Sequence, residues 1–380
     1  MANRAIDVLL PVFNGASTIV EAIESLRRQT LSDIRIIAID DGSSDETPRI
    51  LEELSRADDR IEVIRTPRGG IVDALNAGLA RCQAEFVARQ DADDISEPSR
   101  LALQVAHLRG EPACVAVSGA FKHMDEAGRR LEEIQAFPQP DSADPFWAPS
   151  REPYLLHPFL MARRADLLAV GGYRHVFNAE DTDLYWRLLE RGTLRNLDVP
   201  LGFYRMHGQS ISGASAVNGR IMAVSSQLAA LSARRRRSGR PDLAFPKEAI
   251  ADYCRSPTLA DIYRLAAAHL DGEERSYLRI AAAGKMLELT AYRPYELDSD
   301  DCRFIRAARF EMKTLSADNR RHLNRLYAGA TARLLRKRLI AEAIALSPPR
   351  LYAPALARLV AAGVLPRGVA RHIKDRRALR

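Results

Sequence analysis

The first half of the chain alternates short apolar runs with amphipathic segments. Each apolar run is closed by polar turn residues and is too short for a helix, so it predicts a strand buried on both faces. The predicted strands are residues 6–12, 34–39, 61–65, 85–89, 115–121 and 155–163. Helical spacing follows the first three strands and recurs in residues 181–191, while residues 122–150 are polar and predicted to be rich in loops. This alternation predicts an α/β fold with a mainly parallel central sheet.

The pattern changes after about residue 215, where glycine thins out and Ala, Leu and Arg dominate. Apolar residues there recur at helical spacing in residues 259–270, 277–289, 301–315 and 320–339. We therefore expect two parts, an α/β domain in residues 1–215 and a helical region in residues 216–380. The run Arg234–Arg237, followed by Ser-Gly-Arg-Pro, is interpreted as a linker or exposed turn.

Charge divides the 380-residue chain in a similar way. Residues 1–230 carry 25 basic and 33 acidic residues, a net of −8, while residues 231–380 carry 31 and 16, a net of +15. The four cysteines form no C-x-x-C pair, which is typical of a reducing compartment, and no apolar run reaches 18 residues. We therefore expect a cytoplasmic protein without a transmembrane helix.

Polar residues that could carry chemistry follow the predicted strands. In parallel α/β sheets, ligands bind at the carboxyl ends of strands, where Phe13, Asp41, Gly69 and the pair Asp91 and Asp93 fall. Two carboxylates separated by one residue offer hard oxygen ligands to Mg²⁺ or Mn²⁺. A lone D-x-D motif more often lies in a solvated loop without a function. Its position at a strand end is what favours a functional role here.

Two further motifs have both an ordinary and a chemical interpretation. Glu180 and Asp181 open a predicted helix, where the helix dipole favours acids, but they could also place a general base beside Trp186. His207 follows Tyr204 and Arg205; a single histidine is usually structural, yet histidine is a common metal ligand.

Taken in order, these motifs resemble family 2 glycosyltransferases over about residues 4–212. The motifs are Pro11–Asn14, Asp40–Asp45, Gly69–Gly78, Asp91–Asp94, Gly171–Tyr173, Glu180–Leu184 and Tyr204–His207. The resemblance implies a GT-A fold and the inverting transfer of a sugar from a nucleotide-diphosphate sugar, with UDP the expected nucleotide. It does not extend to the helical region.

The resemblance also implies roles for individual residues. Pro11, Phe13 and Asn14 would meet the nucleotide base together with Asp41, and Arg68, Gly69 and Asn76 would approach the donor nucleotide. Asp91 and Ala92 would meet the ribose or the donor sugar, and Asp93, with Asp91 and His207, would ligate the Mn²⁺ or Mg²⁺ ion. Asp181 matches the catalytic base, while Glu180 and Trp186 would contact the acceptor. Gln90 stands where the family often has an apolar residue.

Two other functions remain open from the sequence. A sugar-phosphate nucleotidyltransferase would show a basic, glycine-rich segment after the first strand, but Asn14–Ile19 is uncharged. A non-catalytic scaffold with this fold would not need Asp91, Asp93 and Asp181. We expect a saccharide or lipid-linked acceptor from cell-surface polysaccharide or glycolipid synthesis.

The basic tail suggests a surface partner. Residues 321–380 carry 14 basic and 2 acidic residues, clustered at 333–338 and 371–380, with few aromatic residues between them. Nucleic-acid binding is therefore not expected. Clustered basic residues among aliphatic ones favour a peripheral contact with anionic lipid at the inner face of the membrane, although a solvated helical surface or an oligomer contact would give the same pattern.

Overall fold

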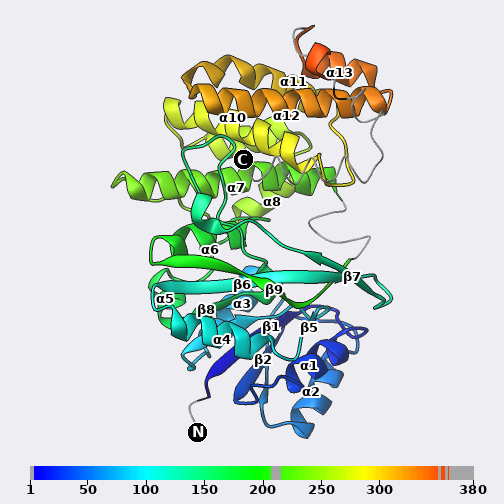
Figure 1. Cartoon of the computed structure of the whole chain (residues 1–380), viewed down its shortest axis with the longest axis vertical. Helices are drawn as coiled ribbons and strands as arrows, with labels where there is room; N and C mark the ends of the chain where they lie inside the picture. The colour runs from blue at the N-terminus through cyan, green and yellow to red at the C-terminus, as the bar shows by residue number, and fades with distance from the viewer. Residues whose placement is uncertain (1–3, 207–214, 350–351, 356–357, 359–380) are drawn as a thin grey trace. The chain divides into compact units, whose positions relative to one another are not determined.

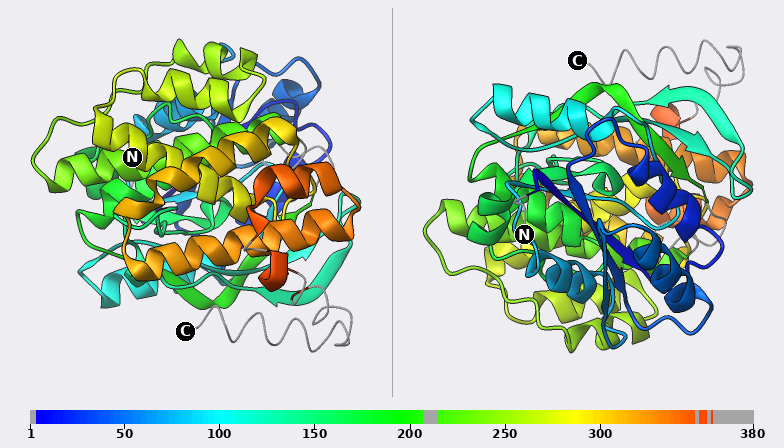
Figure 2. Two further views of the ribbon diagram at one scale, coloured as in Figure 1. Left: turned by 90° about the horizontal axis from the view of Figure 1, so that it is seen from above. Right: turned by 90° about the horizontal axis from the view of Figure 1, so that it is seen from below.

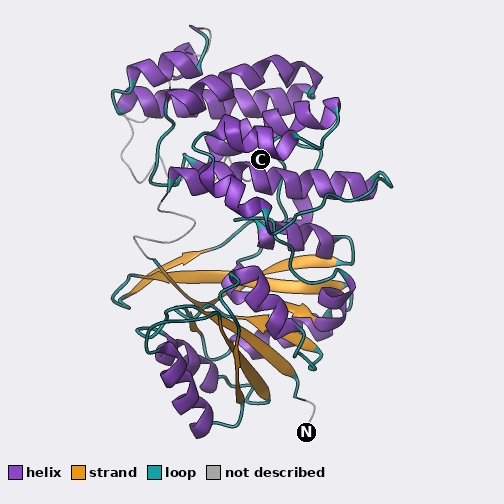
Figure 3. Ribbon diagram, turned by 180° about the vertical axis from the view of Figure 1, so that it is seen from behind, coloured by secondary structure: helices purple, strands orange, loops and turns teal. Residues whose placement is uncertain are grey.

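The chain folds into two units of different architecture. The computed structural model describes the following parts of the chain: residues 4–206, 215–349, 352–355 and 358. The sheet unit consists of Met1–Asp144 with Arg151–Ser210, and the helical unit consists of Pro145–Ser150 with Ile211–Arg380. Among the described residues, every strand belongs to the sheet unit, as the orange arrows in Figure 3 show.

A nine-stranded sheet forms the core of the sheet unit (Figure 1). Its strands are β1 (Ile6–Val12), β2 (Ile34–Asp40), β3 (Ile61–Arg65), β4 (Phe86–Arg89), β5 (Ile95–Ser96), β6 (Cys114–Met124), β7 (Arg130–Gln135), β8 (Met161–Arg163) and β9 (Thr193–Arg205). The spatial order is β3-β2-β1-β4-β8-β6-β9-β5, and β7 pairs with β6. Strands β1 to β4, β6 and β9 share one direction, whereas β5, β7 and β8 run antiparallel to their neighbours. The predicted α/β fold with a mainly parallel sheet is confirmed.

Helices cover both faces of this sheet because its central strands are apolar on both faces. The helices are α1 (Ile19–Arg27), α2 (Thr47–Ala57), α3 (Ile71–Leu79), α4 (Arg100–Gly110), α5 (Arg164–Ala169) and α6 (Glu180–Leu189). Val8 and Leu10 of β1 pack in one buried cluster with α1, α2 and α4, whereas Leu9 packs in another with α3, α5 and α6. The view from below in Figure 2 shows α1 and α2, in blue, beside the first strands.

The sheet changes its order of growth beside β1. Strands β2 and β3 add to one side of β1, and the chain then returns to place β4 on the other side. Such a switch point leaves a crevice at the carboxyl ends of the strands, where ligands bind in open α/β sheets. The loops that follow β1, β2 and β4 begin with Phe13, Asp41 and Gln90 and lie at this edge.

The sheet unit differs from the sequence-based expectations in several features, beginning with α4, α5 and β5, which were not predicted. The longest strand, β9, carries charged residues and Pro200 and was not predicted; its pairing with β6 has shifts in register. Strand β7 lies within the segment expected to be loop-rich. The strand expected at 155–163 is confined to β8, because the residues 157–159 before it form a 3₁₀ turn.

Packed helices form the helical unit. They are α7 (Ala216–Arg237), α8 (Ala249–Arg255), α9 (Leu259–Ala267), α10 (Gly272–Leu289), α11 (Ser299–Ala307), the 3₁₀ helix η3 (Ala308–Thr314), α12 (Ala317–Arg336) and α13 (Ile340–Leu346). The expected helical region is confirmed, but the interpretation of Arg234–Arg237 as a linker is wrong: these residues form the last turn of α7. Arg235 and Arg236 pair there with Glu274 and Asp242, which explains why a basic run continues a helix. No described helix is both long and apolar enough to cross a bilayer.

The helical unit also holds a short segment from the middle of the chain. The amide nitrogen and carbonyl oxygen of Ala148 both bond to the side-chain amide of Asn319, and the backbone nitrogen of Ser150 donates to Gln227 at 2.8 Å. The hydroxyl of Tyr277 donates to the carbonyl of Pro145 at 2.9 Å. Residues 145–150 are thus held by backbone hydrogen bonds to α7, α10 and α12, which composition alone could not reveal.

Candidate active site

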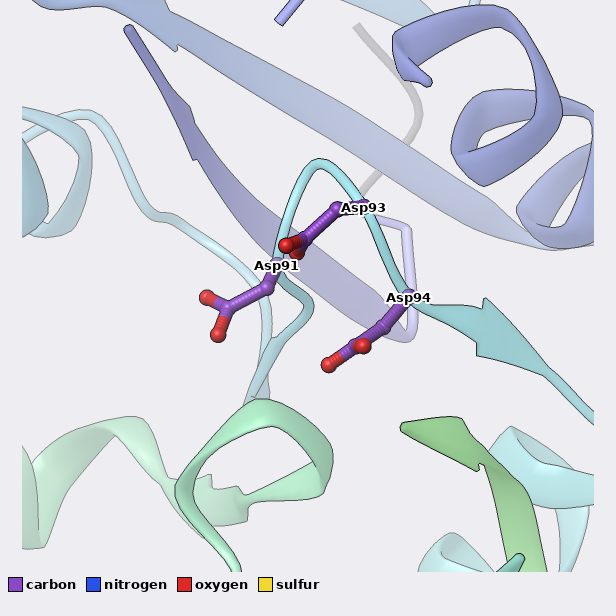
Figure 4. Close-up of side chains that lie close together, drawn as sticks. All are labelled: Asp91, Asp93 and Asp94. Atoms are coloured by element: carbon purple, nitrogen blue, oxygen red, sulfur yellow. The ribbon is translucent and has the colours of Figure 1, made fainter. Parts of the chain in front are cut away.

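Three aspartates share one tight turn between β4 and β5. We call residues Asp91–Asp94 the acidic turn. One carboxylate oxygen from each of Asp91, Asp93 and Asp94 lies within 4.8 Å of the others, and Figure 4 shows all three side chains leaving this turn. Asp94 is buried, with 1% of its surface exposed, while Asp91 and Asp93 are partly exposed. The acidic turn therefore concentrates negative charge at the carboxyl ends of the strands, beside the switch point of the sheet.

Asp94 is held on one side only. Its Oδ1 accepts a hydrogen bond from the backbone nitrogen of Arg205 at 2.8 Å, whereas its buried Oδ2 has no hydrogen-bond partner among the described residues. Burial, together with the charges of Asp91 and Asp93, holds the pKa of Asp94 well above its usual range. A buried carboxylate oxygen without a partner, next to two like charges, is a donor set that a hard divalent cation would satisfy.

Two arginines fix the neighbours of Asp94. Nη2 of Arg89, the last residue of β4, lies 2.5 Å from Oδ1 of Asp91. Burial raises the pKa of Asp91, and the charge of Arg89 opposes that rise. Arg205, at the end of β9, donates from Nε to the carbonyl of Asp93 at 2.8 Å and pairs with Glu21 of α1. Arg89 of β4 and Arg205 of β9 therefore hold Asp91 and Asp93 of the acidic turn in place.

A second acidic pair begins helix α6. Burial and the charge of Asp181 raise the pKa of Glu180 to about 7, and burial also raises the pKa of Asp181. Oδ1 of Asp181 accepts a hydrogen bond from the backbone nitrogen of Thr182 at 2.6 Å. The charge of Asp91 contributes to the shift at Glu180, while the cation of Arg89 opposes the shifts of both α6 acids. The acidic turn and the α6 pair therefore act on each other electrostatically within the sheet unit.

The third acid of this helix has a different environment. Asp183 is fully buried, and its carboxylate pairs with Arg174 and with Arg187 of α6. Arg187 also donates from Nη1 to the carbonyls of Val170 and Gly172, at 2.6 and 2.7 Å. Asp183 therefore anchors the start of α6 to the turn before it, leaving Glu180 and Asp181 as the two acids without such an anchor.

Aromatic residues close the site beneath the α6 acids. Nε2 of His157 lies 3.0 Å from the hydroxyl of Tyr173, and the hydroxyl of the buried Tyr185 has no hydrogen-bond partner among the described residues. Burial drives the pKa of His157 well below its usual range and raises that of Tyr173. Both groups are therefore neutral at physiological pH, so they lower the polarity around the acids without adding charge.

The loops after β1, β2 and β3 are tied to one another. Both carboxylate oxygens of Asp41 accept backbone hydrogen bonds, from Gly69 at 2.8 Å and from Gly70 at 2.9 Å. Gly42 has φ +74°, and a Cβ there would lie 2.9 Å from the backbone nitrogen of Arg68, so this close approach requires glycine. The guanidinium of Arg68 lies 3.0 Å above the centre of the half-exposed Phe13 ring. Together these contacts place an aromatic face, a cation and a buried carboxylate side by side.

Comparisons with known proteins cover the same part of the chain. The model of Glycosyl transferase family 2 matches residues 7–170. The putative glycosyltransferase EpsE of Bacillus subtilis (strain 168) is 30% identical over 210 residues, which cover 54% of this chain and 73% of EpsE. The chain belongs to glycosyltransferase family 2. The O-antigen biosynthesis glycosyltransferase WbnJ of Escherichia coli is 29% identical over 209 residues, covering 54% of this chain and 81% of WbnJ.

Longer relatives match in part. The chondroitin synthase of Escherichia coli is 27% identical over 212 residues, which cover 54% of this chain and 30% of the synthase, so the chain spans less than a third of that relative. The resemblance drawn from the motifs is thus confirmed at the level of the family and of its GT-A fold.

Family motifs that the sequence suggested lie at the strand ends as expected, but several of their side chains are already engaged. The amide oxygen and nitrogen of Asn76 bond to the backbone nitrogen and carbonyl of Tyr173, both at 2.9 Å. Asn14, with φ 49°, accepts from Ser44 through its side chain and donates from its backbone to Ser43. Asn76 and Asn14 therefore brace loops of the site in this structure, and direct contacts with a donor nucleotide stay predictions.

The remaining proposed residues differ in their accessibility. Pro11 lies within β1 and Ala92 within the acidic turn, whereas Trp186 is fully buried inside α6, so its predicted contact with an acceptor is untested. His207 lies outside the described residues. Sequence reasoning gave no role to Asp94, Arg89 or Arg205; the position of Asp94 directly after the D-x-D pair and of Arg205 directly after Tyr204 was the available signal.

One predicted basic cluster is partly neutralised. Arg333 of α12 is 13% exposed in its side chain and pairs with Glu296 at 2.9 Å, and Lys337 pairs with the same carboxylate at 2.7 Å. Arg336 and Arg338 are exposed. The terminal cluster Arg371, Lys374, Arg376, Arg377 and Arg380 lies outside the described residues.

Proposed function

We propose that the protein transfers a sugar from a nucleotide-diphosphate sugar, with UDP the expected nucleotide, to an acceptor hydroxyl with inversion at the anomeric carbon. One observation carries the proposal: the acidic turn and the α6 acids form two carboxylate groups of different character whose charges act on each other. A transfer that expels a diphosphate and deprotonates a hydroxyl needs two such groups. Membership of family 2 supports the same class of reaction.

The acidic turn would hold the divalent cation, Mn²⁺ or Mg²⁺. Asp93 and Asp91 are the proposed ligands, and the carboxylate of Asp94, whose Oδ2 has no partner among the described residues, adds a third ligand within reach. Bound there, the cation would act as a Lewis acid that neutralises the charge developing on the leaving diphosphate. His207 remains a proposed fourth ligand.

The donor nucleotide would bind over the loops after β1 and β2. Phe13 offers a half-exposed ring to the base beside Pro11. Asp41 keeps acceptor capacity at Oδ2, which can accept a second hydrogen bond besides that from Gly70. The guanidinium of Arg68 covers the face of Phe13, so the base would stack on the guanidinium or take its place on the ring. Gly69 lets the backbone come close to the donor without a side chain in the way.

Asp181 is the proposed general base. Its carboxylate would take the proton of the acceptor hydroxyl while that oxygen forms a bond to the anomeric carbon. The bond from that carbon to the phosphate oxygen breaks, and its electron pair leaves with the nucleoside diphosphate. One displacement from the opposite face inverts the configuration. The raised pKa of Asp181 suits a proton acceptor that works near neutral pH, and Glu180 would hold the acceptor.

The acceptor is proposed to be a saccharide or a lipid-linked saccharide of cell-surface polysaccharide or glycolipid synthesis. The names of relatives support this class, because WbnJ is an O-antigen biosynthesis glycosyltransferase and another relative is a chondroitin synthase. A peripheral contact of residues 321–380 with anionic lipid would bring the protein to such an acceptor, with the terminal cluster as its main contributor. Sedimentation with anionic and neutral vesicles tests this contact; equal binding to both would contradict it.

The proposal is tested with the purified protein and a panel of UDP-, GDP- and dTDP-sugars with Mn²⁺. With a saccharide acceptor present, we expect release of a nucleoside diphosphate from one of them. Release of pyrophosphate from a nucleoside triphosphate and a sugar 1-phosphate would favour a nucleotidyltransferase, and no release from either mixture would favour a scaffold. Asp181→Asn should lower turnover by about 10²–10⁴-fold while nucleotide binding survives. Glu190→Gln, an exposed acid beyond the other end of α6, is the matched control and should keep full turnover. Near-normal turnover of Asp181→Asn would contradict the assignment of the base.

A further inference from the structure

An arginine without a carboxylate partner lies beneath the acidic turn. Arg100, the first residue of α4, is fully buried, and no Asp or Glu lies within ion-pair distance of it among the described residues. A buried cation without a paired anion costs several kcal/mol unless hydrogen bonds satisfy it. Burial lowers its pKa to about 9, which leaves the guanidinium charged at neutral pH. Its position therefore calls for an explanation beyond packing.

The hydrogen bonds of Arg100 reach both ends of the acidic turn. Nη2 donates to the carbonyl of Arg89, two residues before Asp91. Nη1 donates to Oγ of Ser96, two residues after Asp94, at 2.8 Å, and to Oε1 of Gln90 at 3.2 Å. One rigid, planar group thus sets the separation between the strand that enters the turn and the strand that leaves it.

Gln90 extends this connection into the turn itself. It is fully buried, and its Nε2 donates to the carbonyl of Asp94 at 3.2 Å and to the carbonyl of Ala22 in α1 at 3.0 Å. Its Oε1 receives the bonds from Arg100 and Ser96. An apolar side chain at this position could make none of these bonds. The amide therefore couples the guanidinium to the backbone of Asp94, whose Oδ2 has no hydrogen-bond partner among the described residues.

The other side of Arg100 is fixed to the sheet. Nε donates to Oε1 of Gln104 at 3.1 Å, and Nε2 of Gln104 donates to the carbonyl of Phe159 at 2.7 Å and to that of Val117 in β6 at 3.3 Å. The guanidinium carbon lies 5.0 Å above the ring of Phe159. All three nitrogens of the Arg100 guanidinium are thus hydrogen-bonded: Nε to Gln104, Nη1 to Ser96 and Gln90, and Nη2 to the carbonyl of Arg89.

We propose that Arg100 is a positioning residue that fixes the spacing of the acidic-turn carboxylates for a divalent cation, acting through Gln90 and Ser96. This inference rests on the proposed function, because that function places the cation at the turn. Residues that orient metal ligands without touching the metal typically change metal affinity by about 10–100-fold when altered. Lysine would keep the charge of Arg100 but would lose the planar fork.

The test measures Mn²⁺ binding directly, by the loss of the free Mn²⁺ signal in electron paramagnetic resonance, on the full-length protein without donor. We expect Arg100→Lys to weaken Mn²⁺ binding by about tenfold. Gln90→Met removes the hydrogen bonds of the amide and keeps a side chain of similar length, and it should weaken binding by a smaller factor because Arg100 keeps its bonds to Ser96 and to the carbonyl of Arg89. The double variant should be no weaker than Arg100→Lys alone, because both changes break the same connection.

Arg163→Lys is the matched control. Arg163 also donates to backbone carbonyls, those of Cys114 and Leu108, but it has no hydrogen bond to the acidic turn or its flanking residues. It should lower the melting temperature and leave the Mn²⁺ affinity unchanged. Wild-type affinity in both folded Arg100→Lys and Gln90→Met, or equal weakening by Arg163→Lys, would overturn the inference. A wild-type protein that binds no Mn²⁺ would instead overturn the metal site of the proposed function, and this inference with it.

Discussion

Helices α6 and α10 begin with similar acidic sequences but use them differently. Helix α6 of the sheet unit has Glu180 and Asp181 in its first turn, and α10 of the helical unit has Glu274 three residues after its cap, Asp271. In α10 the two acids form a capping box, and Arg235 binds both oxygens of Glu274, at 2.6 and 2.7 Å. This arrangement lowers the pKa of Glu274.

No arginine or lysine lies within ion-pair distance of the α6 pair among the described residues, and α6 has no side-chain cap. Burial raises the pKa of both Glu180 and Asp181, and the charge of Asp181 adds to the rise at Glu180. An acid that its surroundings satisfy contributes to the fold, whereas one that they leave unsatisfied is available for a proton or a ligand. The difference lies in tertiary partners, not in the local sequence.

The largest effect on stability is expected at a satisfied acid. Asp301 in α11 is fully buried and binds Nε and Nη2 of Arg220, each at 2.9 Å. Asp301→Asn removes one charge of a buried pair and leaves Arg220 with less compensation. We expect a loss of about 3–5 kcal/mol in the free energy of unfolding, measured by urea denaturation followed by circular dichroism.

Asp300→Asn is the matched control for this change. Asp300 precedes Asp301 but is exposed, and within the described part of the chain its ion pair is with Arg303, so its substitution should change stability by less than about 1 kcal/mol. Equal losses of unfolding free energy in the two variants would mean that burial of the Asp301–Arg220 pair does not add to stability. That result would contradict the claim that satisfied acids stabilise the helical unit.

The pH dependence of stability should have opposite signs in the two helices. Glu180 has a pKa of about 7 in the folded state and an ordinary value of 4.5 in the unfolded state. The contribution of Glu180 to the free energy of unfolding is present below pH 4.5 and is lost as the pH rises to about 7. Glu180→Gln should therefore stabilise the protein more at pH 8 than at pH 5, by about 1–3 kcal/mol.

Glu274→Gln completes this comparison. The folded pKa of Glu274 is lowered, so its stabilisation is present above pH 4.5 and is lost as the pH falls below that value. This variant should lose stability at both pH 5 and pH 8. Comparing each variant with wild type at the same pH removes the opposite contribution of His157, whose lowered pKa favours the folded state at high pH. A Glu180→Gln effect that does not change with pH would contradict the raised pKa.

The sequence predicted those parts of the fold whose signals are local. Strand β1 and its neighbours are continuous apolar runs, and Asp91, Asp93 and Asp181 stand at their ends or at a helix start, so periodicity and motif order sufficed. Strand β9 escaped prediction because its pairing with β6 compensates for charged residues and a proline that propensity disfavours.

The supporting residues of the site could not be found in this way. Arg89, Arg100 and Arg205 look like any surface arginine in a chain that has 50 of them, and their roles depend on which backbone carbonyls the fold brings near. The same holds for the run at 234–237, where Arg235 meets a carboxylate 39 residues away. Long-range hydrogen bonds to backbone atoms leave no spacing rule in the sequence.

The smallest effect on the free energy of unfolding is expected at Asp271, whose carboxylate both caps α10 and carries a charge. Oδ1 of Asp271 accepts a hydrogen bond from the backbone nitrogen of Glu274 at 2.9 Å, and Oδ2 pairs with the half-exposed Arg240. Asp271→Ala should cost about 1 kcal/mol of unfolding free energy, because a backbone donor of the first turn loses its acceptor. Asp271→Asn keeps that acceptor and should cost only a few tenths, because exposed ion pairs contribute little. Neither variant should change sugar transfer, which is measured as release of nucleoside diphosphate. If Asp271→Asn lowered transfer although it leaves the cap intact, the acids of the helical unit would act on catalysis as well as on folding, and the division between the two regions would have to be abandoned.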